Sequence, residues 1–523
     1  MAGNTLENMD KSSFSPMMQK YLETKEKYKD CILFYRLGDF YEMFFDDAVN
    51  VSQELELTLT GKDCGQAERA PMAGIPHHAA EVYAEKLIEK GYKVAICEQL
   101  EDPKTAKGIV KRGVIRVVTP GTVIESNMLE EKKNNYIMSI VKKGIYYGIA
   151  VCDVTTGDFY STEIKENNNF PLVLDEIARY SPAELVVNSM MYDSKEEIGK
   201  IKERFEIYFT RFNDKFFSED INTIVENYNL VNNDDNPIKD IDKRLFSVAS
   251  INALVEYLKQ TQKTSLEHIN KIIMYNTTRY MSLDINARRN LELTEKMRDK
   301  SKKGTLLWVL DKTSTSMGGR HLRRWINDPL IDVNEINKRL NAVKELKENV
   351  MLRGDIIESL KKVYDIERLA GKISYGSANA RDLLSLKNSA KQLPDVKKYN
   401  IIPSFFISHI YYFGDIHIKN LGIKRAEHIS PAGSSLKHNI LFTFHQDTPV
   451  IEPDMFETIW CAVNRKTKEG KVLGENEKIS VLEAIKAVTI NVAYQYGEEN
   501  IKGSLKVGKN ANMIIINKNP LKI

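Results

Sequence analysis

The pentapeptide GDFYE at residues 38–42 combines residue types that could act on a nucleic acid. A Gly-Asp turn would project an aromatic ring, Phe40, with a carboxylate, Glu42, two residues later. Such a ring can wedge into a weakened base stack, and the cost, on the order of a few kcal/mol, is lowest at a mispair. The carboxylate can accept a hydrogen bond from a base edge. The plainer alternative, that Phe40 is core and Glu42 a solvated helix residue, is favoured by the pentapeptide alone.

The segment KTAKGIVKRGVIR at residues 104–116 contains no acidic residue. Its cationic residues are Lys104, Lys107, Lys111, Arg112 and Arg116. They could neutralise DNA phosphates without selecting a sequence, although a short charge run is usually a solvated surface loop. Arg36 is a further candidate for a phosphate contact. The adjacent pair His77-His78 lacks a third ligand for a metal and is expected to order a loop.

The elements that must position these residues follow from local patterns. Ser15-Pro16 predicts the start of a helix. We expect helices at 15–30, 40–55 and 81–91, strands at 31–35 and 93–99, and a turn at 38–39. These elements form a mixed α/β unit that ends near residue 125.

The pattern then changes. Residues 145–164 alternate like a β-hairpin around a TTGD turn, and 172–188 suggest helix, turn and strand, which together favour a three-layer α/β domain up to about residue 260. Residues 263–398 carry helical spacing with charged faces, which indicates a helical lever or bundle. The tail after 398 has a different character. The predicted domains are therefore 1–125, 126–260, 261–398 and 399–523.

Composition agrees with several folded domains. The chain has 523 residues, 42% hydrophobic and 28% charged, which suits three or four soluble domains. A net charge of only +3 means that a nucleic-acid signal must be local. The five cysteines show no CxxC spacing, and neither a signal peptide nor an apolar run long enough for a membrane is present. We therefore expect a cytoplasmic protein with no membrane partner.

Three long segments resemble the mismatch-recognition domain of the MutS DNA mismatch-repair family. They are LFYRLGDFYEMFFDDA, the segment APMAGIPHHAAEVYAEKLIEKGYKVAICEQLEDP, and VTPGT, in the family's order and at fitting separations. In that family the Phe of an F-x-E motif stacks on the mispaired base and the Glu bonds to it. The resemblance implies these roles for Phe40 and Glu42, with mismatched double-stranded DNA as partner. It outweighs the plainer alternative.

The resemblance continues to residue 398. VCDVTTGDFYST and SPAELVV resemble the family's RNase H-like connector, which here lacks the clustered carboxylates of a two-metal nuclease. LDINARRNLELTE, GTLLWVLDKTSTSMGGRHLRRWINDPL and DIERLAGKI resemble the core-lever domain. Five arginines in these segments are expected to pack and form ion pairs rather than bind DNA: Arg288, Arg289, Arg320, Arg323 and Arg324.

In the MutS family a clamp and an ATPase follow, with ATP and Mg as cofactors, a homodimer, and downstream repair proteins as partners. We find neither domain here. Residues 503–510, GSLKVGKN, have the GxxxxGK spacing, but Asn replaces the hydroxyl residue and a predicted strand at 512–518 follows instead of preceding. We therefore expect no nucleotide site, no cofactor and no ATPase activity in this chain.

The tail resembles the C-terminal end of a YtcJ-type metal-dependent amidohydrolase, a TIM barrel with a small β-sandwich. The resemblance rests on residues 402–415, 428–450 and 479–497. It implies that Asp447 matches the last-strand Asp that binds metal or acts as a base, and that His409 lies at the pocket. The HxH motif of the first barrel strand is absent, and a catalytic metal needs at least three ligands. We expect Asp447 to be a remnant, with no metal site and no hydrolase activity.

The sequence thus predicts a multidomain α/β and α protein with a mixed α/β recognition domain, an RNase H-like connector, a helical lever and a partial TIM-barrel/β-sandwich tail. The favoured function is binding of mismatched DNA, without enzymatic activity. A metal-dependent amidohydrolase and a non-functional fusion are the alternatives. The boundary near residue 398, where one resemblance ends and the other begins, is compatible with a gene fusion, a rearranged gene or an assembly error.

Overall fold

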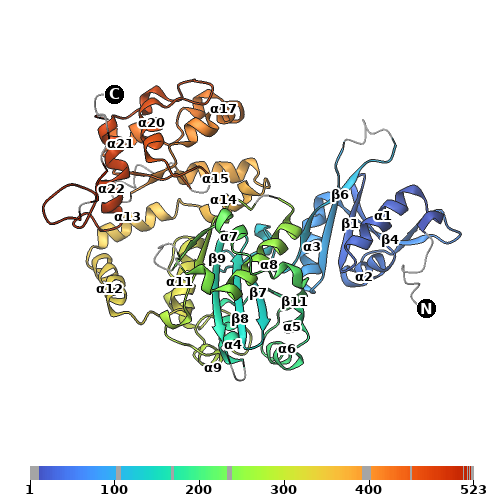
Figure 1. Cartoon of the computed structure of the whole chain (residues 1–523). Helices are drawn as coiled ribbons and strands as arrows, with labels where there is room; N and C mark the ends of the chain where they lie inside the picture. The colour runs from blue at the N-terminus through green and yellow to red at the C-terminus, as the bar shows by residue number, and fades with distance from the viewer. Residues whose placement is uncertain are drawn as a thin grey trace. The chain divides into compact units, whose positions relative to one another are not determined.

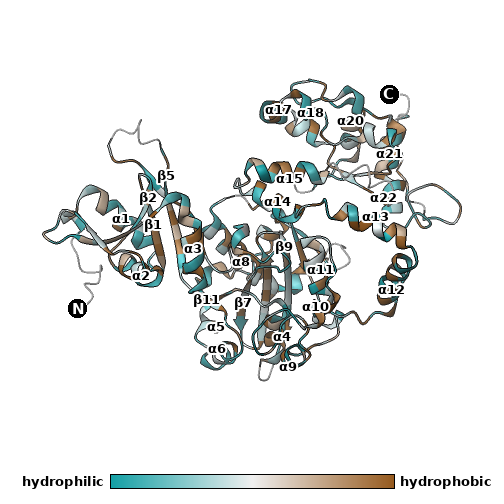
Figure 2. Ribbon diagram, turned by 180° about the vertical axis from the view of Figure 1, so that it is seen from behind, coloured by the Kyte–Doolittle hydropathy of each residue, from teal (hydrophilic) through white to brown (hydrophobic). Residues whose placement is uncertain are grey.

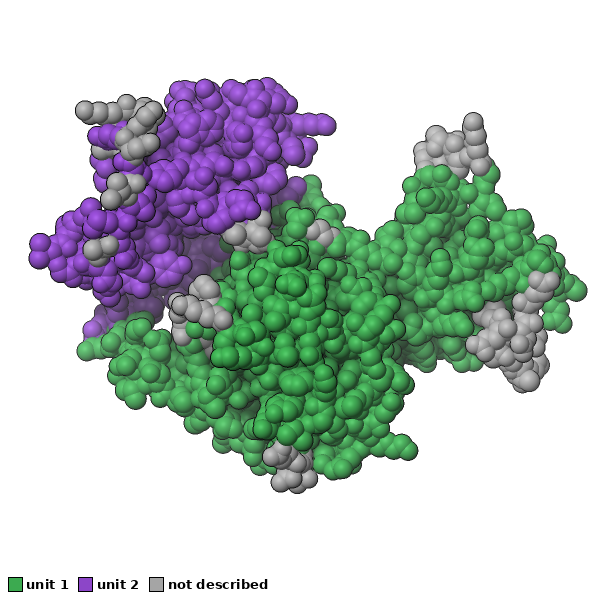
Figure 3. Space-filling model, in the orientation of Figure 1, with its two compact units in different colours: residues 1–344, 365–382 green, residues 345–364, 383–523 purple. Residues whose placement is uncertain are grey.

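The structure, a computed structural model, describes most of the chain: residues 11–101, 108–166, 170–232, 238, 240–264, 266–390, 402–447, 450–510, 512–514, 516 and 519. Helices and strands follow one another along the chain as labelled in Figure 1. The chain forms two compact units, residues 1–344 with 365–382 and residues 345–364 with 383–523, which Figure 3 colours separately. The prediction of a multidomain protein with mixed α/β parts is confirmed.

The first sheet of unit 1 is mixed, with the strand order β3-β4-β2-β1-β5-β6. Its strands are β1 (Cys31–Leu37), β2 (Phe40–Phe44), β3 (Thr60–Lys62), β4 (Ala70–Pro76), β5 (Lys93–Gln99) and β6 (Arg112–Val118). Helix α1 (Pro16–Lys27) packs on one face, and α2 (Asp46–Leu55) and α3 (Ala80–Glu89) pack on the other. Strand β1, strongly apolar in Figure 2, is buried on both faces.

The predicted helix over 40–55 is wrong in its first third. Residues Phe40–Phe44 form strand β2, and α2 begins only at Asp46. Within β2, Tyr41 and Met43 are buried while Phe40 is exposed, which is the period of two that a strand requires. Phe45, with φ of 54°, separates strand from helix. The predicted elements corresponding to α1, β1, α3 and β5 are confirmed.

A buried carboxylate joins three elements of this domain. Asp47 of α2 accepts hydrogen bonds from Lys25 Nζ of α1 at 2.9 Å and from the backbone N–H of Leu33 in β1 at 3.0 Å. The side chains of Lys25 and Asp47 are only 13% and 5% exposed. Burial raises the pKa of the Asp47 carboxyl, and Lys25 opposes that rise.

The second sheet of unit 1 has the order β11-β10-β7-β8-β9-β13-β12. Its strands are β7 (Tyr136–Lys143), β8 (Tyr146–Asp153), β9 (Asp158–Lys165), β10 (Glu184–Val187), β11 (Tyr208–Arg211), β12 (Asn229–Val231) and β13 (Lys271–Met274). Helix α4 (Pro171–Tyr180) packs on one face and α8 (Leu245–Gln262) on the other; shorter helices are α5 (Ser189–Tyr192), α6 (Lys195–Lys202) and α7 (Asn222–Asn227). The predicted hairpin is β8–β9, and β13 lies beyond the expected boundary at residue 260.

A series of helices follows, in agreement with the helical spacing of the sequence. They are α9 (Ile285–Asn290), α10 (Leu306–Leu310), α11 (Ser316–Asn327), α12 (Val333–Glu348), α13 (Val350–Leu360), α14 (Ile366–Ser374) and α15 (Ala380–Ala390). Several of them begin at a side-chain cap; for example, Thr315 accepts a hydrogen bond from the N–H of Gly318 at the start of α11.

The tail in unit 2 is mainly helical. Two short strands, β14 (Ser404–Phe405) and β15 (Thr443–Phe444), pair in parallel. The helices are α17 (His409–Leu421), α18 (Ile423–Ala426), α19 (Ala432–Lys437), α20 (Met455–Asn464), α21 (Val481–Val488) and α22 (Ile490–Gln495). The predicted strand over 512–518 is not formed by its described residues, 512–514 and 516.

One buried arginine organises the loops of the tail. Arg465 is fully buried and donates hydrogen bonds to the carbonyl oxygens of Leu473 at 2.7 Å, Ile429 at 2.8 Å and Ser430 at 3.0 Å. Burial lowers the pKa of its guanidinium to about 10. The loops are therefore tied by a charged group whose donors are satisfied by backbone.

None of the helices in the described ranges combines the length and the apolar character that crossing a membrane requires.

The packing of β8 against α8 makes a stability prediction. A Cβ added at Gly148 would lie 1.8 Å from the carbonyl oxygen of Phe246, whereas a Cβ at Gly199 in α6 meets nothing within 4 Å. We expect Gly148→Ala to destabilise its domain by about 3 kcal/mol or more, because backbone must move. Gly199→Ala, the control, should be neutral or stabilising by up to about 1 kcal/mol. Calorimetry of the full chain measures both; an unchanged melting profile for Gly148→Ala would contradict this packing.

The buried Asp47 makes a pH-dependent prediction. Lys25→Met leaves the carboxylate without its cation, which we expect to cost about 3 kcal/mol. Because the folded pKa of Asp47 is raised above its unfolded value, stability falls as pH rises between those two pKa values, and removing Lys25 extends this window upward. The loss measured by calorimetry should therefore be larger at about pH 8 than at about pH 5.

The matched control for that variant is Lys20→Met. It lies on the same helix but pairs with Glu23 in solvent, with side chains 59% and 55% exposed. An exposed pair contributes little, so no measurable change is expected. Equal losses in the two variants would exclude a special role for the buried pair.

Candidate nucleic-acid interface

The motif at residues 38–42 forms a tight turn between β1 and β2. Gly38 has φ of 61°, a conformation that glycine adopts without strain, and a Cβ there would meet nothing within 4 Å. The strands pair antiparallel with Leu37 opposite Phe40. His77 closes the turn, since its backbone N–H and its ring Nδ1 lie 2.9 and 3.1 Å from the carbonyl oxygen of Asp39. His77 thus orders this loop, as predicted.

Phe40 is exposed at the tip of this hairpin. Its side chain is 48% exposed, so it is not a core residue. Alternation along β2 places Phe40, Glu42 and Phe44 on the face that α1 covers. Helix α1 packs over Phe44, whose ring centroid lies 4.9 Å from that of Tyr21. The opposite end of the same face therefore presents an uncovered aromatic ring.

Glu42 lies beside Phe40 and is held by a cation. Its carboxylate forms an ion pair with Lys62 of β3, with side chains 15% and 32% exposed. Glu42 is thus neither in a helix nor freely solvated. Its carboxylate still has acceptor capacity, because two oxygens offer about four lone-pair sites. Lys62 was missed by the sequence analysis, since only the pairing of β3 with β4 and of β4 with β2 brings it near.

Glu98 of β5 supports the hairpin from the neighbouring strand. Its carboxylate accepts hydrogen bonds from Arg36 Nη1 at 3.2 Å and from the hydroxyl of Tyr41. Burial, together with this carboxylate, raises the pKa of Tyr41. The carbonyl oxygen of Arg36 accepts a bond from Arg112 Nε at 2.7 Å. Sequence reasoning missed Glu98 as well, because nothing local marks it as a partner of residues more than fifty positions away.

The cationic candidates are not all alike. Arg36 and Arg112 lie beside the hairpin, and Lys111 is exposed next to Arg112. Arg116 instead points to Glu125 as an ion pair and donates to the carbonyl oxygen of Thr122 at 3.0 Å, with its side chain 14% exposed. The structure therefore brings Arg36 and Arg112 together with the motif and turns Arg116 inward. The remaining two candidates, Lys104 and Lys107, lie outside the described residues.

Two of the five helical-domain arginines, Arg320 and Arg323, form the ion pairs that were predicted. Arg320 is buried and bonds Asp365 and Glu367 at 2.6 and 2.7 Å. Arg323 pairs with Glu295 at 3.5 Å, and Arg324 contacts the hydroxyl of Tyr160. For Arg288, Arg289 and Arg324 the prediction of ion pairing is wrong within the described ranges, where none of them has an acidic partner at ion-pair distance.

The tail gathers histidines around its short parallel strands. The His409 ring lies 4.9 Å from that of His417, and Ser404 Oγ lies 2.9 Å from His445 Nδ1. Burial lowers the pKa of all three imidazoles. Asp447, at φ of 52°, follows β15 and acts electrostatically on His409 and His445.

These groups do not make up a metal centre. Across the described residues, no cluster of three or more His, Cys, Asp or Glu side chains is arranged to hold a metal ion. The donor set therefore does not fit the metal that a hydrolase of the amidohydrolase type would need. At the GxxxxGK segment, Lys509 Nζ donates to Ser504 Oγ at 2.8 Å and to the carbonyl oxygen of Glu499 within its own loop.

Four family models match the chain in order. They are MutS domain I at residues 15–127, MutS domain II at 135–270, MutS domain III at 286–406, and the amidohydrolase family at 351–523. The last two overlap over residues 351–406. Matches of both kinds therefore meet in the segment that precedes the tail.

Curated relatives agree over the N-terminal part. The DNA mismatch repair protein MutS of Acetivibrio thermocellus is 56% identical over 392 residues, 74% of this chain and 44% of that protein. Those of Ruminiclostridium cellulolyticum and Lachnoclostridium phytofermentans are 55% and 52% identical over 73% and 74% of this chain, and 43% and 41% of their own lengths. The chain thus spans less than half the length of these relatives. Its N-terminal three quarters matches MutS domains I, II and III, and its C-terminal part matches the amidohydrolase family model.

Proposed function

We propose that this chain binds mismatched duplex DNA through the hairpin of β1 and β2. Phe40 acts as the wedge and Glu42 as the hydrogen-bond acceptor. The observation that carries the proposal is the half-exposed Phe40 ring at a glycine turn held by His77. Single exposed apolar residues are common, so exposure alone would not suffice. The curated relatives are named for DNA mismatch repair, which supports the same function.

The support beneath the ring favours a wedge over a flexible contact. Arg36 and Tyr41 are both fixed by Glu98, and they flank the turn on β1 and β2. A ring on a rigid hairpin loses little side-chain freedom when it enters a base stack. The unstacking cost is smallest where pairing is already weak, so the geometry discriminates by deformability and not by base sequence.

Lys62 reduces the electrostatic repulsion between the Glu42 carboxylate and DNA phosphates. An unpaired Glu42 would repel the DNA backbone, whereas the ion pair with Lys62 lowers that repulsion. A protonated base nitrogen or an amino group can still donate to the unused lone pairs of Glu42. Arg36, Lys111 and Arg112 are the proposed phosphate contacts, together with Lys104 and Lys107. Arg116 is left out of this set because Glu125 already neutralises it.

The proposal also assigns an identity to each domain of the chain. We infer a recognition domain over 1–125, an RNase H-like connector over 126–260, a helical lever over 261–398 and a partial amidohydrolase barrel over 399–523. After residue 398 the amidohydrolase match stands where the MutS family continues into its clamp, and we infer that mismatch preference is weak. A homodimer, downstream repair proteins and a cytoplasmic location are implied by the family.

Phe40→Ala tests the wedge. The native chain should bind a duplex with a G·T mispair more tightly than its matched twin, and the variant should lose that preference while keeping salt-sensitive background binding. Stacking on one base is worth about 1–3 kcal/mol, roughly five- to 150-fold in affinity, so loss of the ring is enough to abolish a weak preference. Fluorescence anisotropy of both duplexes at two salt concentrations measures this.

Trp308→Ala is the matched control, because Trp308 of α10 is also 48% exposed. It should leave the preference unchanged. Equal binding of the native chain to both duplexes, unaffected by Phe40→Ala, would show that the motif does not function here.

A metal-dependent amidohydrolase is the second candidate, and the family match at residues 351–523 favours it. We propose that this activity is absent, because the described residues contain no group of three or more His, Cys, Asp or Glu side chains arranged to hold a catalytic metal. Metal analysis of the purified chain should find far less than one zinc or iron per chain, with the same amount in Asp447→Ala. A stoichiometric metal that Asp447→Ala removes would establish the hydrolase instead.

A further inference from the structure

Unit 1 contains a cavity of about 760 Å³ that is unusually rich in arginine and lysine. It is lined by the segment before β7, the end of α4, the segment after α6, α9 with the segment after it, and α11. Ten cationic and only five acidic side chains face it. A concave wall with one prevailing charge concentrates ions of the opposite charge.

Several of these cations are neutralised by the protein itself. Arg179 pairs with Asp328 at 2.7 Å, and Lys300 pairs with Glu206 at 3.0 Å. Arg323 and Lys133 share Glu295. The excess charge must therefore come from the remaining cations.

Arg320 pairs with Asp365 and Glu367, and Arg324 contacts the hydroxyl of Tyr160. The cations that remain available are Arg204, Arg288, Arg289 and Lys296. Within the described parts of the chain, none of the four has an acidic side chain at ion-pair distance. Arg288 donates from Nε to the carbonyl oxygen of Leu283 at 3.0 Å, but its Nη1 is buried with no hydrogen-bond partner among the described residues. Burial lowers the pKa of Arg288. A buried donor without an acceptor is costly, and an anionic oxygen would remove that cost.

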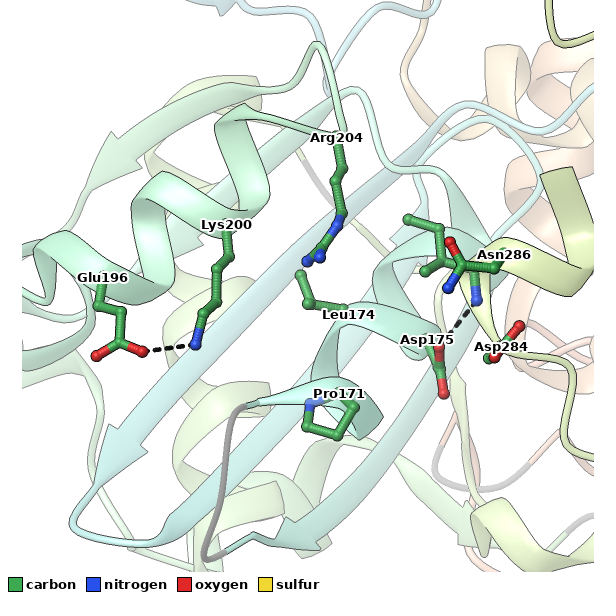
Figure 4. A pocket seen from close by; sticks show the side chains of 9 residues that line it. Pro171, Leu174, Asp175, Glu196, Lys200, Arg204, Asp284 and Asn286 are labelled. Atoms are coloured by element: carbon green, nitrogen blue, oxygen red, sulfur yellow. Dashed lines mark hydrogen bonds and ion pairs between the residues drawn. The ribbon is translucent and has the colours of Figure 1, made fainter.

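An adjoining pocket of about 580 Å³, shown in Figure 4, shares Arg204 and Asn286 with the cavity. Its acids are already in use, since Asp175 and Asp284 accept backbone N–H bonds at the start of α9 at 3.1 and 2.6 Å. Its Lys200 pairs with Glu196. In Figure 4 Arg204 extends toward Leu174, between Lys200 and Asn286. Arg204 is therefore available where the two hollows meet.

The cavity also has an apolar wall. Phe205, Leu293 and Met297 line it beside the arginines. Its volume lies within the usual range of small-molecule sites, roughly 300–1,000 Å³, and a concave site of this size does not admit a nucleic-acid duplex. The ligand should therefore be small, multiply charged and partly apolar.

We propose that this cavity binds a small phosphate-bearing anion, with its phosphates against Arg288, Arg289 and Arg204 and any ring system against Phe205 and Met297. This site is separate from the β1–β2 hairpin and does not depend on the function proposed for it. Inorganic polyphosphate and a nucleoside phosphate share the required chemistry. Only the nucleoside phosphate has a ring system that can contact the apolar wall.

Titration calorimetry of the full chain with inorganic triphosphate and with deoxycytidine triphosphate tests the proposal, in low-salt buffer containing a chelator. The native chain should bind both, and the nucleotide at least as tightly. Arg289→Glu and Arg204→Glu change exposed side chains, so folding should persist, and each should weaken both ligands by about tenfold or more. Arg288→Gln should weaken them as well.

Arg298→Glu is the control, because Arg298 is exposed on the same segment but does not line the cavity. It should leave binding unchanged. The proposal is overturned if neither ligand binds the native chain saturably, or if Arg298→Glu weakens binding as much as Arg289→Glu. It is also overturned if Arg289→Glu weakens a short matched duplex by the same factor, which would assign these arginines to DNA.

Discussion

The buried carboxylate of Asp47 is the constraint on which the first α/β domain depends. It accepts one hydrogen bond from Lys25 of α1 and another from the backbone N–H of Leu33 in β1. Asp47 itself belongs to α2. A carboxylate in such a place is unfavourable unless its partners are present, so the three elements are held in one arrangement. The strand pair that carries Phe40 starts from this fixed base, and the position of the ring follows from it.

A second buried carboxylate acts in the same way where the first domain meets the second sheet. Glu184 of β10 accepts hydrogen bonds from the hydroxyls of Thr210 and Tyr257, both at 2.6 Å, and from the N–H of Gly121 at 3.2 Å. Glu184 is fully buried, and Lys93 of the first sheet lies 5.7 Å from the Tyr257 ring. The segment after β6 is therefore bonded to the second sheet by a polar network, which is more specific in geometry than apolar packing alone.

A buried charge whose donors all have acceptors contrasts with groups that the fold leaves without partners. Arg465 is buried with acceptors in place, and it ties together segments that are distant in sequence. Arg288 has a buried donor without an acceptor, and Phe40 is an aromatic ring without cover. Such departures from internal consistency are expected where a protein meets a ligand, because binding removes a cost that the fold leaves open.

The sequence by itself determined most of the elements and the motif. Ser15-Pro16, the apolar run at 31–35 and the alternation at 145–164 are local signals, and the corresponding helix, strand and hairpin depend on neighbours within a few residues. Phe40 and Glu42 were selected because several long segments around them resemble the MutS family, since the pentapeptide alone favours the plainer alternative. The strand β2 was mistaken for a helix because its period of two extends over only five residues before α2 begins.

Tertiary structure alone decided which partners these residues have. Lys62 and Glu98 reach the hairpin through pairing of strands that are distant in the chain, so no local pattern marks them. The same holds for Arg116, which resembles a phosphate contact in sequence but is neutralised by Glu125. Charge is visible in a sequence, whereas its neutralisation depends on which side chains folding brings within a few ångströms.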